Sequence, residues 1–180
     1  MAPAQRDRLM EHIMMSASPD SDAPAIRWSA AAEAGFVGGI VYLMIALLFI
    51  PLFIGGTVWG VIRMIAAIVL GSGVLPPPDT FDVGVVLTGT VLHLLLATVY
   101  GAILAVIVNG SNRGAALLVG ALFGLVLYIV NFYVFTGVFP WFAAARTWVT
   151  VLTHVGFGVA VAWSYTAIAV TPRRSWSAER

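Results

Sequence analysis

The sequence predicts an all-α, polytopic membrane protein whose core is a bundle of four transmembrane helices. The first observation is composition: 61% of the 180 residues are hydrophobic and only 9% are charged, whereas soluble domains carry about 25% charged residues. The second is that apolar residues occur in runs longer than the ~18 that indicate a membrane span. The third is that short polar or proline-containing segments separate these runs.

The first third of the chain contains one clear span and one ambiguous segment. Residues 1–30 are polar and predict a mostly disordered arm, and residues 31–54 form the first span, with Pro51 near its end. Residues 57–72 are apolar but short, and Arg63 at their centre would cost about 3 kcal/mol in a lone span. We therefore expect an interfacial or re-entrant helix here, with a fifth span as the alternative.

The remaining chain supplies three further spans. Residues 82–108 form the second span and a polar turn follows it at 109–114. Residues 115–136 form the third span, which ends in an aromatic and proline segment typical of a water–lipid boundary. Residues 147–170 form the fourth, and residues 171–180 form a basic tail. The expected membrane domain is therefore 31–170.

The arginines predict the orientation. With both termini in the cytoplasm, seven of the nine positive charges lie on the cytoplasmic side, and only Arg63 and Arg146 lie outside. This distribution agrees with the positive-inside rule. The seven are Arg6, Arg8, Arg27, Arg113, Arg173, Arg174 and Arg180.

Small residues at four-residue spacing predict how the helices associate. Lipid provides no hydrophobic force between helices, so small side chains must let their backbones approach closely. Every predicted span carries such a pattern, and together the patterns favour a compact bundle. The glycines expected to pack are Gly35, Gly39, Gly101, Gly120, Gly124 and Gly158.

Two pairs of segments resemble each other and suggest a duplicated helical hairpin. Residues 34–42 align with residues 120–128, and each stretch ends in a tyrosine. The second and fourth spans carry similar threonine–histidine stretches that end at His93 and His154. Two copies in the same orientation would be related by a pseudo-two-fold axis along the membrane normal.

The two histidines are the main candidates for chemistry. Ionisable side chains within a span are rare and usually face a functional interior. His93 and His154 fall at similar depths, and Asn131 and Tyr128 approach this level on the third span. The pair could ligate a b-type haem, bind a metal or relay protons. Alternatively, each histidine is neutral and hydrogen-bonds a neighbouring group.

Other classes of function have little support in the sequence. Arg63 and Arg146 could attract an anion at the outer mouth, although boundary arginines are commonly solvated. The near-neutral charge argues against nucleic-acid binding, and the lack of cysteine excludes thiolate chemistry. No nucleophile elbow, phosphate loop or zinc-protease motif is present. We therefore expect a protein that is not an enzyme and that has no certain cofactor or metal.

The order of these features resembles the YagU-type family of small bacterial inner-membrane proteins. The matching stretches are His93 with its flanks, Gly120-Ala-Leu122, Phe139-Pro-Trp141, and Gly156 near His154. The resemblance covers about residues 30 to 175, and the first loop departs from the pattern. It implies an inner-membrane location and a link to acid tolerance, without an established activity.

Three hypotheses about function follow. The first is an accessory subunit or homo-oligomer in the lipid bilayer, assembled through lipid-facing glycine seams. The second is a proton-linked channel or transporter that works through His93 and His154. The third is a haem b electron-transfer subunit that uses the same pair as axial ligands.

Overall fold

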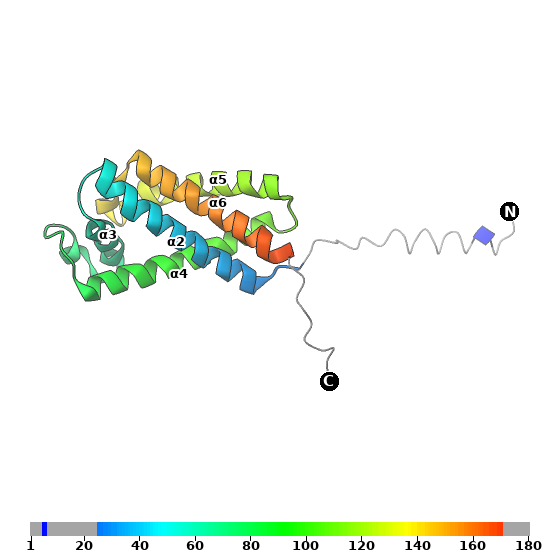
Figure 1. The fold of residues 1–180 in the computed structure, drawn as a ribbon, viewed down its shortest axis with the longest axis horizontal. Coiled ribbons are helices and arrows are strands. Elements are labelled where there is room, and N and C mark those ends of the chain that lie inside the picture. The colour runs from blue at the N-terminus through cyan, green and yellow to red at the C-terminus, as the bar shows by residue number, and fades with distance from the viewer. Residues whose placement is uncertain (1–4, 7–24, 171–180) are drawn as a thin grey trace, which may run out of the picture.

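The computed structural model describes residues 5–6 and 25–170, and within these ranges every regular element is a helix (Figure 1). Four helices are long and apolar enough to cross a membrane, which confirms an all-α, four-helix membrane protein. They are α2 (Trp28–Phe53), α4 (Val83–Val108), α5 (Arg113–Ile129) with its continuation to Gly137, and α6 (Trp148–Val170). Most of the predicted arm and all of the tail at 171–180 lie outside the described residues.

The predicted third span differs from the structure in one respect. The α-helix ends at Ile129 rather than continuing to residue 136, and one π-helical turn follows, η2 (Val130–Val134). Two short 3₁₀ segments, η3 (Phe135–Gly137) and η4 (Pro140–Ala145), lead from it to α6. The sequence here is mostly apolar and aromatic, so hydropathy alone does not reveal the change in helix type.

The bundle has two distinct ends. The termini end is where α2 begins and α6 finishes, and there the Arg27 guanidinium donates to the Ile168 carbonyl at 2.6 Å. The α3 end carries α3 (Val58–Leu70), η1 (Ser72–Val74), η3 and η4. Because the four long helices alternate in direction, α2 and α5 run towards the α3 end, and α4 and α6 run back (Figure 1).

Helix α6 packs between α2 and α5 through glycines. A methyl group added to Gly124 would overlap the carbonyl group of His154, and one added to Gly38 would overlap Val161. Gly120 and Gly158 likewise meet backbone to backbone. These glycines therefore pack within the bundle and do not form the lipid-facing seams of the first functional hypothesis.

Helix α2 also packs closely on α4. A Cβ atom built on Gly35 would lie 2.8 Å from the Thr98 Cα, and one built on Gly101 would overlap Gly35. Gly39 meets Ala97 in the same seam, with 2.7 Å between an added Cβ and the Ala97 Cβ. All six glycines predicted to pack thus lie at helix–helix contacts.

The aligned segments do not follow a two-fold arrangement. The Gly38 and Gly124 positions correspond in the alignment, yet both face α6, one from each side. A two-fold axis would place one of these faces on α4 instead. Moreover, α2 packs tightly on α6, whereas α4 and α5 contact each other sparsely. Duplication of the hairpin stays a prediction about the sequence.

Helix α3 is a short cover at one end of the bundle. Its 13 residues span about 20 Å at 1.5 Å per residue, which is less than the ~30 Å hydrocarbon core. It packs on α4 at Gly89, where an added Cβ would overlap the Ile62 side chain at 2.8 Å. The following loop returns to its start, because the Thr57 amide donates to Asp79 Oδ2 at 3.1 Å. These bounds agree with a short helix rather than a fifth span.

Candidate functional site

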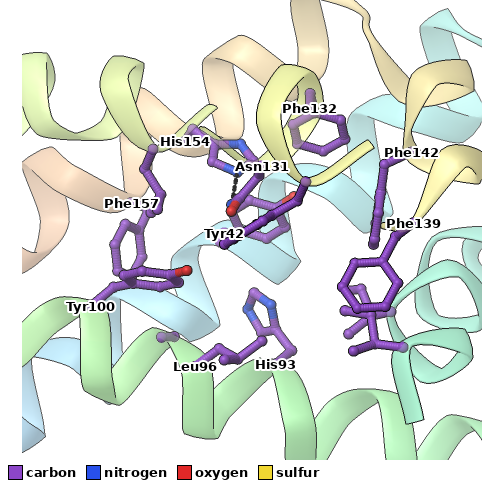
Figure 2. Close-up of a pocket in the computed structure, with 15 residues that line it drawn as sticks. Tyr42, His93, Leu96, Tyr100, Asn131, Phe132, Phe139, Phe142, His154 and Phe157 are labelled. Carbon is purple, nitrogen blue, oxygen red and sulfur yellow. Dashed lines mark hydrogen bonds between the residues drawn. The ribbon is translucent and has the colours of Figure 1, made fainter. Parts of the chain in front are cut away.

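A cavity of about 280 Å³ lies in the half of the bundle nearer the α3 end. It forms where α4 and α5 diverge, with α6 behind it and α3 beside it (Figure 2). Its wall is mainly aromatic and aliphatic, and its polar members come from α2, α4, η2 and α6. These are Tyr42, His93, Tyr100, Asn131 and His154.

His93 reaches across the α2–α4 seam to a backbone carbonyl. Its Nε2 lies 3.0 Å from the Gly39 carbonyl oxygen. A carbonyl only accepts, so Nε2 carries the proton of the neutral imidazole and Nδ1 is left as an acceptor. Gly39 allows α2 and α4 to lie this close, because a Cβ there would lie 2.7 Å from the Ala97 Cβ.

His154 has the opposite tautomer. Its Nδ1 lies 2.8 Å from the Thr150 carbonyl oxygen, so Nδ1 donates. Nε2 of the neutral ring must then accept, and Asn131 Nδ2 lies 3.3 Å from it. The Asn131 amide therefore presents its NH₂ to His154 and its Oδ1 elsewhere. His154 is only 3% exposed, which makes this pairing important.

The π-helical turn positions Asn131. Single π turns commonly occur at functional sites because they insert an extra residue and rotate the following side chains. Here η2 begins at Val130, one residue before Asn131, and also contains Phe132, whose ring contacts His154 at 5.4 Å between centroids. The turn thus brings an amide and an aromatic ring to the same histidine.

Tyr42 connects the two histidines, as Figure 2 shows. Its ring centroid lies 4.8 Å from that of His93 and 5.0 Å from that of His154. Tyr128 contacts His154 at 5.9 Å but does not line the cavity. The four predicted site residues therefore gather, but the tyrosines that line the cavity are Tyr42 and Tyr100, and Tyr42 is the one in contact with both histidines. The sequence did contain an indication of this role, because Tyr42 ends the first glycine stretch and aligns with Tyr128.

Two acceptor atoms in the cavity wall have no protein partner. Within the part of the chain that the structure describes, no residue hydrogen-bonds to Nδ1 of His93 or to Oδ1 of Asn131. Both side chains line the cavity and are only partly buried. Polar atoms with adjacent space bind water or a ligand.

A second cavity of about 180 Å³ adjoins the first towards the α3 end. The two cavities share Tyr42, Ile65, Phe132 and Phe142 as wall residues. Asp79 lines the second cavity, and its Oδ1 is buried without a hydrogen-bond partner among the described residues. A narrow aromatic and aliphatic boundary therefore separates a carboxylate from the histidine cavity.

The two arginines expected to contact an anion lie elsewhere. Arg63 donates to the carbonyls of Thr80 at 2.9 Å and Val74 at 3.0 Å, which holds the return loop on α3. Arg146 donates to the Phe132 carbonyl at 2.7 Å. Neither arginine lines either cavity. Arg63 thus stabilises the loop after α3 and Arg146 stabilises η2 and η3, roles that residue type and position did not reveal.

The described residues contain no cluster of three histidine, aspartate or glutamate side chains that could hold a metal ion. Comparisons of the whole chain with family models, with curated proteins and with solved structures found no match.

Proposed function

We propose that this membrane protein binds a small, mostly apolar molecule with one polar group in the cavity between α4 and α5. The observation that carries this proposal is the convergence of polar side chains from α2, α4, η2 and α6 on a single aromatic cavity. Apolar pockets with a few placed polar groups are typical of small-molecule sites. A volume of about 280 Å³ favours a ligand of one or two rings.

The proposed setting is a bacterial inner membrane, with both termini in the cytoplasm and the α3 end outside. The arginine distribution supports this orientation, and the resemblance to the YagU-type family supports the location. In this orientation the second cavity lies between the histidine cavity and the external medium. Ligand would then enter from outside or from the adjacent lipid leaflet.

The binding test uses 4-fluorobenzyl alcohol as the probe and fluorine NMR of the purified full chain in detergent micelles. We expect a saturable, shifted or broadened resonance with the wild type. Leu96→Trp places a larger side chain in the cavity wall and should weaken binding at least about tenfold. Leu95→Trp is the matched control, because Leu95 is 60% exposed and does not line the cavity.

Equal signals from the wild type and both tryptophan variants would mean that the probe enters only the micelle. That outcome would overturn the proposal, provided that circular dichroism and gel filtration show all three proteins to be folded. Loss of binding in both variants would also count against it, because Leu95 lies outside the cavity wall.

Proton-linked transport is a second candidate, and the His154–Asn131 pair favours it. If Nε2 of His154 gains a proton it can no longer accept, and the Asn131 amide must rotate to present Oδ1 instead. The cavity would then receive an amide donor in place of an acceptor. A pH-driven probe flux in proteoliposomes that is lost in Asn131→Leu would support this candidate, and flux indifferent to that change would remove it.

The geometry does not fit a haem between the two histidines. Both Nε2 atoms already have protein partners, at 3.0 Å and 3.3 Å. The Tyr42 ring also contacts both imidazoles and lies between them in Figure 2. A bis-histidine haem would require this tyrosine and both hydrogen bonds to move.

An accessory or homo-oligomeric role would need a surface other than the glycine seams. Those seams are filled within one chain, whereas the outward face of α4 carries large apolar side chains such as Leu87, Val91 and Leu95. We propose the lipid bilayer as the surroundings of this face. Assembly into a larger complex would not conflict with ligand binding in the cavity.

A further inference from the structure

Two polar side chains of the cavity each leave a hydrogen-bond acceptor without a protein partner among the described residues. The proton on His93 Nε2 is donated to the Gly39 carbonyl, which leaves the Nδ1 lone pair. One N–H of Asn131 is donated to His154 Nε2, and Oδ1 is left as an acceptor. Tyrosine hydroxyls can act in either sense. A ligand that donates hydrogen bonds would satisfy both atoms, and one that only accepts would leave them unpaired.

The apolar wall adds a preference for positive charge. Seven phenylalanine and tyrosine rings line the cavity, and the faces of such rings attract ammonium groups. No arginine lines either cavity to repel a cation. These side chains are Tyr42, Tyr100, Phe132, Phe135, Phe139, Phe142 and Phe157.

The second cavity, at the α3 end, also favours a positively charged ligand. Asp79 is the charged residue among the described side chains that line the second cavity. Its Oδ2 accepts from the Thr57 amide, and its Oδ1 remains without a partner in the described chain. An acceptor with a full negative charge therefore precedes the neutral acceptors of the histidine cavity.

We infer that the ligand is a small primary amine on an apolar ring or chain, which enters past Asp79 and donates to His93 Nδ1 and Asn131 Oδ1. This inference rests on the proposed binding function and specifies its chemistry. The shared boundary of Ile65, Phe132 and Phe142 is the constriction that such a ligand would pass.

Four ligands of similar shape test the inference by fluorine NMR of the full chain: 4-fluorobenzylamine, 4-fluorobenzyl alcohol, 4-fluoroacetophenone and 4-fluorotoluene. The amine offers a charged donor, the alcohol a neutral donor, the ketone only an acceptor, and the toluene neither. We expect the amine to bind at least about tenfold more tightly than the ketone, with the alcohol between them. Leu96→Trp should abolish the saturable component for all four.

The outcomes separate the two levels of the proposal. Equal binding of all four ligands, lost in Leu96→Trp, would overturn the amine inference and leave the binding function standing. Tighter binding of the ketone than of the amine would also overturn it. Equal affinities of the alcohol and the amine would show that the positive charge does not contribute, which would overturn the choice of an amine. If none binds in a saturable way, the binding function itself is wrong.

Two variants locate the donor contacts. His93→Leu removes the Nδ1 acceptor, so the amine should lose about tenfold in affinity while 4-fluorotoluene is unchanged. Asp79 lies outside the long helices, and Asp79→Asn keeps the size of the side chain. This variant therefore tests the entry route of the ligand even if the histidine variant folds poorly. It should slow association of the amine but not of the alcohol. Unchanged association of the amine would overturn the proposed entry route.

Discussion

The two sides of the bundle are built on different principles. On one side, α6 packs against α2 and α5 with glycines in contact with backbone, and α2 packs against α4 in the same way. On the other side, α4 and α5 diverge and leave a cavity that holds the membrane-embedded histidines. The glycine contacts leave no space for a larger side chain, whereas the cavity has space for a ligand. The difference lies in where small residues occur at helix–helix contacts, since all four long helices are apolar enough to cross a membrane.

The largest effect should come from filling a glycine seam. Gly124→Ala places a methyl group against the carbonyl of His154, and Gly101→Ala places one against Gly35, so the helices must separate. We expect each to cost about 1–3 kcal/mol or more of unfolding free energy, measured by denaturation in mixed micelles. Gly137→Ala is the matched control, because an added Cβ there has nothing within 4 Å.

A substitution on the cavity side should be tolerated by comparison. Ile68→Phe adds volume at a wall residue of the cavity, so the ring can enter existing space and should change stability by less than about 1.5 kcal/mol. The measurement is the same denaturation. If Ile68→Phe were as harmful as Gly124→Ala, the contrast between a filled side and an open side would not hold.

The cover at the α3 end should show an intermediate, local effect. Arg63→Gln removes two charge-assisted hydrogen bonds to the loop carbonyls of Thr80 and Val74, which are worth about 1.5–3 kcal/mol. We expect faster hydrogen exchange in residues 72–82 with little change in the middle of α6. Arg146→Gln is the comparison, since its partners lie in η2 and η3. Equal exchange of residues 72–82 in the two variants would argue against this role for Arg63.

The smallest effect should be the coupling between Asn131 and His154. Their hydrogen bond of 3.3 Å lies within a membrane bundle, where such bonds contribute about 0.6–2 kcal/mol. A double-mutant cycle with Asn131→Leu and His154→Leu measures the coupling directly. A cycle between Asn131→Leu and Thr166→Val serves as the control, because Thr166 bonds only within its own helix. A coupling no larger than the control would show that the amide does not hold this histidine.

Hydropathy was sufficient to predict the four helices, because a membrane requires long apolar segments with internally bonded backbones. The rarity of polar residues in those segments likewise identified His93, His154 and Asn131. The cavity could not be predicted in this way, since it depends on which small residues meet and on the π-helical turn that contains Asn131. The roles of Arg63 and Arg146 could not be predicted either, because their acceptors in the return loop, in η2 and in η3 leave no periodic signal in the sequence.

The most direct test of the open side uses the natural absence of cysteine in the chain. Single cysteines at Leu127, which lines the cavity, and at Val126, which is 57% exposed on the outer surface, can be compared in liposomes. The probe is 2-aminoethyl methanethiosulfonate, which is itself a small amine. It reacts with a cysteine only where water and the reagent can reach the thiol group. We expect Leu127→Cys to react faster than Val126→Cys and 4-fluorobenzylamine to protect it. Equal or slower labelling at Leu127 would contradict an accessible, amine-binding cavity between α4 and α5.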